Sequence, residues 1–125
     1  MTAGQKVVWI LDDDPDIRTA LERLLSVHGY CPHSFASIAE FNACVSLHEA
    51  DCLILDIRLD AECGIDLKRQ LSLSRPALPV IFITGCDSHA TRQAVEQVGC
   101  AAYLQKPFGC KVLLEAIETA IHNNS

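Results

Sequence analysis

Four short apolar segments that run directly into polar residues constrain the fold of this chain more than any other feature. The segments are residues 7–11, 52–55, 80–83 and 101–104, and the polar residues that follow them include Asp12, Asp56, Thr84 and Lys106. The segment 52–55 shows no alternation of apolar and polar residues, which is typical of a parallel strand covered by helices on both faces. Ligands bind beyond the carboxyl ends of such strands, so the polar residues mark a candidate site.

Helical patterns lie between and after these segments. Asp14 and Pro15 provide an N-cap and a first helical residue, Ser37 and Glu40 form a capping box, and Gly29 and Gly99 are expected helix ends. The third helix is expected from Gly64 to about Ser74, and the fourth, whose apolar face consists of small residues, looks thinly anchored. The apolar positions expected in the other four helices are Ile17, Ala20, Leu21, Leu24 and Leu25; Phe41, Ala43, Cys44 and Leu47; Ala90, Ala94, Val95 and Val98; and Val112, Leu113, Ala116, Ile117, Ala120 and Ile121.

A short strand is also expected at residues 30–35, which gives five strands alternating with five helices. Right-handed crossovers between parallel strands arrange this order as an α/β, doubly wound sandwich of (βα)5 type with a five-stranded parallel sheet. The chain has 125 residues, half of them hydrophobic, so we expect a single domain over residues 1–125 with a core at about 6–121 and no output domain in this chain.

The charge and the hydropathy pattern exclude several classes of partner. The net charge is −6 and no cluster of Lys and Arg is present, which argues against direct binding of nucleic acid by this chain. No apolar run approaches the ~20 residues of a membrane span, and Met1–Lys6 does not have the shape of a signal peptide. We therefore expect a cytoplasmic protein that does not enter a membrane.

The chain has seven cysteines and five histidines. An odd number of cysteines without a C-x-x-C pair favours reduced thiols over a disulfide framework or a zinc site. Because most cysteines lie in or beside apolar segments, we expect them to be mostly buried as small hydrophobic residues, with redox sensing as the alternative. The histidines lack the spacing of metal ligands.

The expected sheet brings three carboxylates together. If Asp12, Asp13 and Asp56 lie about 5 Å apart, each pair repels by roughly 3 kcal/mol at an effective dielectric constant of ~20. Each residue alone could cap a helix or form a turn, but together they require a cation, and Mg²⁺ fits oxygen ligands that also admit a phosphate. With Thr84 and Lys106 nearby, Asp56 is equipped to act as a nucleophile on a phosphoryl group.

These motifs resemble the receiver domain of bacterial two-component response regulators, most similar to the FixJ type, over about Lys6 to Ile121. The residues that carry the resemblance are Leu11-Asp12-Asp13-Asp14, Asp56, Gly64, Thr84-Gly85, Tyr103 and Lys106-Pro107-Phe108. The resemblance implies a flavodoxin-like, CheY-like fold in which Asp56 is the phosphoacceptor. It also implies catalytic roles for Asp56, Thr84 and Lys106, and a cis peptide bond before Pro107.

The resemblance further implies Mg²⁺ as the cofactor, bound by Asp13, Asp56 and the backbone carbonyl of Arg58, with Asp12 acting largely through water. The implied phosphodonor is a sensor histidine kinase or a phosphotransfer protein, and the aspartyl phosphate hydrolyses slowly. Thr84 and Tyr103 are the implied switch residues, which reshape a surface of the fourth helix, fifth strand and fifth helix. That surface would form a homodimer or contact an effector domain or protein, and transcription regulation would need such a further domain or chain.

One departure from the family pattern lies after the acceptor. Leu59-Asp60 stands where the family usually has Met-Pro. The missing proline should leave the loop of residues 60–63 less restricted, and Asp60 and Glu62 add two carboxylates near the pocket. The expected effects are on loop conformation and metal affinity.

Three other classes of function compete with a phosphorylated receiver. A pseudo-receiver that acts only as an interaction module would not need the acceptor, the acidic pair, Thr84 and Lys106, all of which are present. A haloacid-dehalogenase-like phosphatase needs a second aspartate two residues after the nucleophile, where this chain has Arg58. A nucleotide-binding Rossmann protein needs a G-x-G-x-x-G motif after the first strand, which is absent from the sequence.

Overall fold

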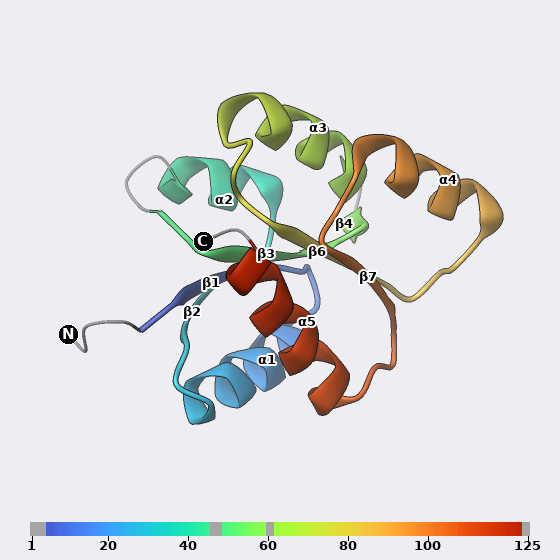
Figure 1. Ribbon diagram of the computed structural model, residues 1–125. Helices are drawn as coiled ribbons and strands as arrows, with labels where there is room; N and C mark the ends of the chain where they lie inside the picture. The colour runs from blue at the N-terminus through green and yellow to red at the C-terminus, as the bar shows by residue number, and fades with distance from the viewer. Residues whose placement is uncertain (1–4, 46–48, 60–61, 124–125) are drawn as a thin grey trace.

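The computed structural model describes residues 5–45, 49–59 and 62–123. A five-stranded parallel sheet, in the order β2-β1-β3-β6-β7, forms the centre of the molecule (Figure 1). Its strands are β1 (Val7–Leu11), β2 (Cys31–Phe35), β3 (Cys52–Asp56), β6 (Val80–Thr84) and β7 (Ala102–Gln105). The predicted doubly wound α/β fold is confirmed. Predictions for Met1–Gly4, Leu47, Asp60, Ala61 and the last two residues lie outside the described residues.

Five helices cover the two faces of the sheet (Figure 1). They are α1 (Pro15–Val27), α2 (Ile38–Val45), α3 (Gly64–Ser74), α4 (His89–Val98) and α5 (Cys110–Asn123). Helices α1 and α5 pack on one face, and α2, α3 and α4 pack on the other. Successive residues of a strand point to opposite faces. Accordingly, Leu53 and Leu55 belong to the core under α2–α4, whereas Ile54 belongs to the core under α1 and α5.

The predicted helix ends are confirmed. The Asp14 side chain accepts the backbone N–H of Asp16 at 2.9 Å, and Pro15 occupies the first turn. The Ser37 hydroxyl accepts the N–H of Glu40 at 3.1 Å, which is half of the predicted capping box. Gly99, with φ of 76°, ends α4 in a conformation that an L residue rarely adopts. These local signals fix where the chain changes direction around the sheet.

A short antiparallel ribbon after β3 was not predicted. Strand β4 (Arg58–Leu59) pairs with β5 (Glu62–Cys63) directly after Asp56. Strands of two residues are too short to give a periodic sequence signal. Leu59 is 2% exposed, so this ribbon returns an apolar side chain to the core immediately beyond the acceptor position.

The prediction of mostly buried cysteines is wrong. Only Cys52 is buried, Cys31 and Cys63 are half-buried, and the four exposed cysteines are Cys44, Cys86, Cys100 and Cys110. Cys44 lies on α2 and Cys110 is the first residue of α5, whereas Cys86 and Cys100 lie in loops. All seven are free, as expected for reduced thiols.

Four further positions of the predicted apolar helix faces are also exposed, namely Ala20, Ala43, Ala90 and Val112. On α2, Phe41 is fully buried but Ala43 is exposed, and on α5, Leu113 is fully buried but Val112 is 50% exposed.

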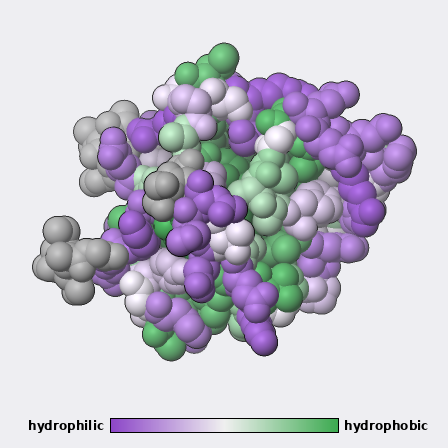
Figure 2. Space-filling model, in the orientation of Figure 1, coloured by the Kyte–Doolittle hydropathy of each residue, from purple (hydrophilic) through white to green (hydrophobic). Residues whose placement is uncertain are grey.

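Helix α4 is as thinly anchored as its sequence predicts, because Val95 is its single buried residue. Figure 2 shows mainly hydrophilic residues over this helix, at the right of the view. Within the described residues, no helix has both the length and the apolar character that crossing a membrane requires.

Candidate functional site

The carboxyl ends of the strands place the predicted site residues at one edge of the sheet. The parallel register aligns Leu11 of β1 with Leu55 of β3, so Asp12 and Asp56 follow side by side. Asp56 is opposite Ile83 of β6, and Thr84 is opposite Gln105 of β7. The register therefore brings together side chains that are separated by up to 94 residues in the sequence.

The ammonium group of Lys106 joins two buried carboxylates. Its Nζ atom lies 2.9 Å from Oδ2 of Asp12 and 3.2 Å from Oδ2 of Asp56. Asp12 is fully buried and Asp56 is 5% exposed. Burying an ionised carboxylate costs free energy unless the group is paired and hydrogen-bonded. Lys106 therefore offsets the free-energy cost of burying the two aspartates and the repulsion between them.

Backbone N–H groups hold the other oxygens of the same carboxylates. Oδ1 of Asp12 accepts the N–H of Asp14 at 2.9 Å, and Oδ1 of Asp56 accepts the N–H of Arg58 at 3.2 Å. The guanidinium of Arg18 donates to the Asp12 carbonyl at 2.8 Å. This contact stabilises the loop that carries the acidic pair. Arg18 was not predicted as a site residue, because only its position in the first turns of α1 pointed to the site.

The pKa values of the central groups follow from burial and charge. Burial, followed by the charge of Asp12, raises the pKa of Asp56 to about 6, and Lys106 and the Arg58 N–H oppose this increase. Burial lowers the pKa of Lys106, but its hydrogen bonds and charge interactions with Asp12 and Asp56 outweigh burial and leave the pKa raised. The pocket therefore holds a cationic lysine beside a carboxyl group whose pKa lies above that of an ordinary aspartate.

Three carboxylates form a group that could hold a metal ion. One oxygen each from Asp12, Asp13 and Asp56 lie within 4.8 Å of one another, and Asp13 is exposed while the other two are buried. One ammonium against three carboxylates leaves an excess of negative charge. A set of oxygen donors with one side open to solvent suits Mg²⁺, which keeps waters and accepts phosphate oxygens. The residues present therefore fit the ion.

Thr84 ends β6, the strand next to β3, and Tyr103 lies on β7, one strand further away, and the hydroxyls of both residues bond to other partners. The Thr84 side chain is buried, and its hydroxyl exchanges hydrogen bonds with the backbone of Cys86. The Tyr103 hydroxyl donates to Oδ1 of Asp87 at 2.8 Å. The backbone N–H of Lys106 donates to the Thr84 carbonyl at 2.7 Å, and the Lys106–Pro107 bond is cis, as expected.

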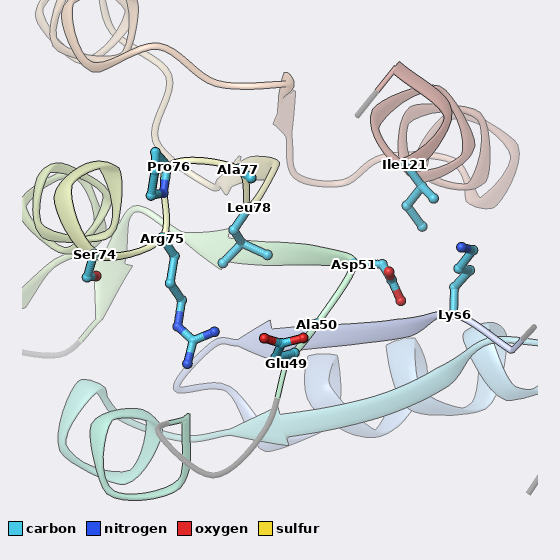
Figure 3. A pocket seen from close by; sticks show the side chains of 10 residues that line it. All are labelled: Lys6, Glu49, Ala50, Asp51, Ser74, Arg75, Pro76, Ala77, Leu78 and Ile121. Atoms are coloured by element: carbon cyan, nitrogen blue, oxygen red, sulfur yellow. The ribbon is translucent and has the colours of Figure 1, made fainter. Parts of the chain in front are cut away.

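A separate pocket of about 670 Å³ lies at the opposite end of the sheet (Figure 3). Asp51, which precedes β3, and Arg75, which follows α3, are among its lining residues. The Asp51 carboxylate accepts the N–H of Val7 at 2.9 Å, and the Arg75 guanidinium lies 5.3 Å from the centre of the Trp9 ring. These interactions connect the segments that precede β3 and follow α3 to strand β1. The pocket lies away from Asp56 and is not part of its site.

Residues 8–118 match the family model of the response regulator receiver domain. The chain belongs to the response regulator receiver domain family. The match covers the acidic pair, Asp56, Thr84, Tyr103 and Lys106. The predicted resemblance is thus confirmed at the level of the family, and the further likeness to the FixJ type stays a prediction.

Curated relatives agree with this assignment. The chain is 34% identical over 115 residues to the DNA-binding transcriptional regulator NtrC of Escherichia coli K12, and 33% identical over 121 residues to the response regulator protein TodT of Pseudomonas putida F1. These alignments cover 92% and 97% of this chain but only 24% and 53% of the relatives. The chain therefore spans about a quarter to half of their length.

Solved structures share the fold. A CheY-like receiver domain protein from Methanospirillum hungatei has a TM-score of 0.91 at 26% identity, with 97% of each chain covered. The beryllofluoride-activated NtrC4 receiver domain dimer has a TM-score of 0.90 at 26% identity, with 97% of this chain and 100% of that chain covered. The receiver domain is the phosphoacceptor part of a two-component response regulator, and the cluster of Asp12, Asp13 and Asp56 fits that role. The pseudo-receiver alternative is not favoured.

Proposed function

We propose that the Asp56 carboxylate of this receiver domain accepts a phosphoryl group from a sensor histidine kinase or phosphotransfer protein in a Mg²⁺-dependent reaction. The observation that carries the proposal is the position of Lys106, whose ammonium contacts Asp12 and Asp56 inside a cluster of three carboxylates. Of the three, Asp56 alone ends the central strand of the sheet. This position gives its carboxylate a rigid backbone support.

The arrangement provides the parts that phosphoryl transfer needs. An Asp56 oxygen forms a bond to phosphorus while the bond from phosphorus to the donor's histidine nitrogen breaks, and the electron pair leaves with that nitrogen. Lys106, which contacts Asp56, would pair with the phosphoryl oxygens, and Thr84, at the end of the neighbouring strand β6, would donate its hydroxyl to them. Asp13, Asp56 and the Arg58 carbonyl would hold Mg²⁺, with Asp12 acting largely through water, and the bound ion would supply further positive charge beside the transferred group.

The proposed readout of phosphorylation begins at Thr84. A phosphoryl group on Asp56 offers the Thr84 hydroxyl a charge-assisted hydrogen bond, which is stronger than a bond to a neutral carbonyl. Movement of Thr84 and Tyr103 then changes the surface formed by α4, β7 and α5. We propose that this surface dimerises or contacts an effector domain or protein, as the activated NtrC4 receiver domain forms a dimer.

The proposal is tested by labelling with a small phosphodonor. Wild-type protein incubated with Mg²⁺ and acetyl phosphate should gain one phosphoryl group by mass spectrometry, and Asp56→Asn should gain none. The matched control is Asp51→Asn, which changes an aspartate at the opposite end of the same strand and keeps an oxygen to accept the Val7 N–H. Equal labelling of wild type and Asp56→Asn would overturn the assignment of Asp56.

A further inference from the structure

A continuous chain of bonds runs from the buried Thr84 to Tyr103. The N–H of Cys86 donates to Oγ1 of Thr84 at 3.0 Å, and the Thr84 hydroxyl donates to the Cys86 carbonyl at 3.2 Å. Thr84 is 1% exposed, whereas Cys86 is exposed. The Thr84 hydroxyl thus fixes the backbone of the residue that directly precedes Asp87.

The Asp87 carboxylate joins three elements at the surface. Its Oδ1 atom accepts the Tyr103 hydroxyl of β7 at 2.8 Å and Nε of Arg92 at 2.8 Å, while its Oδ2 atom accepts Nη2 of Arg92. Its side chain is 14% exposed, compared with 61% for Arg92. Asp87 itself belongs to the loop between β6 and α4, so a single carboxylate connects that loop, the first turns of α4 and the last strand.

Local structure sets the direction of this carboxylate. The Ser88 hydroxyl accepts the N–H of Thr91 at 3.1 Å and thereby caps α4 immediately after Asp87. Arg92 then projects back toward Asp87 five residues earlier. Val95 is the one buried residue of α4, and the ion pair of Asp87 with Arg92 adds a contact between the preceding loop and the start of this helix.

The protonation states match these bonds. Burial, followed by the hydrogen bond to the Asp87 carboxylate, raises the pKa of Tyr103 to about 12. Hydrogen bonds from Arg92 and then Tyr103 lower the pKa of Asp87. The pair is therefore a protonated phenol on an ionised carboxylate at neutral pH, which is a charge-assisted hydrogen bond.

We propose that Asp87 is a positioning residue that holds the Tyr103 ring in its resting orientation and couples that ring to the Thr84 hydroxyl. The coupling rests on the proposed phosphorylation of Asp56. When the Thr84 hydroxyl donates to a phosphoryl oxygen, it gives up its bond to the Cys86 carbonyl, because a hydroxyl has one proton to donate. The loop of residues 85–87 then shifts and carries the Asp87 carboxylate away from Tyr103.

Reorientation of the Tyr103 ring then requires two separate steps. A space opened behind Thr84 would attract the ring, but the ring can move only after its hydroxyl leaves Asp87. The hydrogen bond of Tyr103 to Asp87, here called the clamp, thus adds to the free-energy difference between the two orientations of the Tyr103 ring. A phosphoryl group shifts the population only by the difference between its binding free energies for the two orientations. Removing the clamp should shift the resting population without any phosphoryl group.

The test follows the ring signals of the two tyrosines by NMR of protein with ¹³C-labelled tyrosine rings. Tyr30, which precedes β2, is an internal reference for Tyr103. Spectra are compared with and without beryllofluoride and Mg²⁺ for wild type, Asp87→Ala and Asp66→Ala. The last variant is the matched control, because Asp66 forms a 2.7 Å ion pair with Arg69 on α3 but contacts neither Thr84 nor Tyr103 in the described hydrogen bonds.

We expect Asp87→Ala without beryllofluoride to show Tyr103 signals moved toward those of the beryllofluoride-bound wild type. Addition of beryllofluoride should then cause less than half of the wild-type change at Tyr103. Asp66→Ala should behave as wild type, and Tyr30 should stay unchanged in all three proteins. The proposal is overturned if the Tyr103 signals of resting Asp87→Ala are the same as those of wild type. It is also overturned if Asp66→Ala changes the Tyr103 signals as much as Asp87→Ala does.

The same experiment distinguishes failure of the clamp from failure of the proposed function. Binding of beryllofluoride at Asp56 is read separately from the ¹⁹F signal of the bound group. If no bound group forms in wild type, the phosphoacceptor proposal fails, whereas unchanged Tyr103 signals in resting Asp87→Ala would still show, independently, that Asp87 does not hold Tyr103.

Discussion

Gly64 lies so close to the backbone carbonyl of Asp56 that a Cβ atom at position 64 would come closer than 3.0 Å to that oxygen. The N–H of Gly64 also donates to the Ile57 carbonyl at 2.7 Å, so α3 begins directly against the end of β3. The close approach requires glycine at this position. It also means that the first residue of α3 supports the backbone that carries the acceptor carboxylate.

The first prediction follows from this contact. Gly64→Ala should lower the free energy of unfolding by about 1 to 3 kcal/mol, because the backbone of Asp56 must move to admit the methyl group. Gly109→Ala is the control, since a Cβ atom there would meet nothing within 4 Å. Urea denaturation measures both variants. Equal stability of the two would show that the Asp56 backbone accommodates a side chain at position 64.

The second prediction concerns the cation. A ligand that binds only the folded protein stabilises it by about 2.7 kcal/mol at a concentration one hundred times its Kd. Millimolar Mg²⁺ should therefore raise the melting temperature of wild type, and Asp13→Asn should lose most of that increase. Asp14→Asn, which keeps an acceptor for the Asp16 N–H, is the control and should respond as wild type. A melting temperature that does not change when Mg²⁺ is added would contradict the metal site.

The third prediction separates phosphorylation from its readout. Thr84→Ala should still bind beryllofluoride on Asp56 but should lose the induced changes in the amide signals of residues 85–106, because the alanine cannot donate to the bound group. Any gain of dimer, measured by analytical ultracentrifugation, should also disappear. A complete wild-type response in Thr84→Ala would exclude Thr84 as the start of the switch.

The fourth prediction concerns alkaline pH. Burial raises the pKa of the Cys52 thiol from the ordinary value of 9.0 to about 12. Between these values the unfolded chain loses the thiol proton while the folded chain keeps it, so the stability that Cys52 contributes is present below pH 9 and is lost as the pH rises toward 12. Above pH 9 this loss approaches about 1.4 kcal/mol per pH unit.

Chemical denaturation at pH 8.0 and 10.5 measures this loss. Cys52→Ala should show a smaller decrease in stability between the two pH values than wild type, whatever its offset at pH 8.0. Cys110→Ala keeps the buried Cys52 and changes an exposed cysteine, so it should retain the wild-type decrease. Identical decreases in all three proteins would show that Cys52 does not titrate differently on unfolding.

The sequence predicted the Asp56 site more fully than it predicted the surroundings of Tyr103. Asp12, Asp56, Thr84 and Lys106 each follow an apolar strand, and parallel strands end at one edge of a sheet, so their convergence follows from a topological rule. The contact of Tyr103 with Asp87 follows no such rule. It depends on the path of the loop after β6 and on the rotamer of an exposed arginine, and neither leaves a pattern in the sequence.

The sequence was enough to predict the order and type of the main elements, together with the polar groups at the strand ends. It could do so because hydrophobic periodicity and helix capping act over a few residues. Four features became visible only in the folded chain: the β4–β5 ribbon, the exposure of most cysteines, the support of Asp56 by Gly64, and the hydrogen bond of Tyr103 to Asp87. These features depend on which surfaces meet when distant segments pack, and that choice is made by the three-dimensional fit of the whole core rather than by any local run of residues.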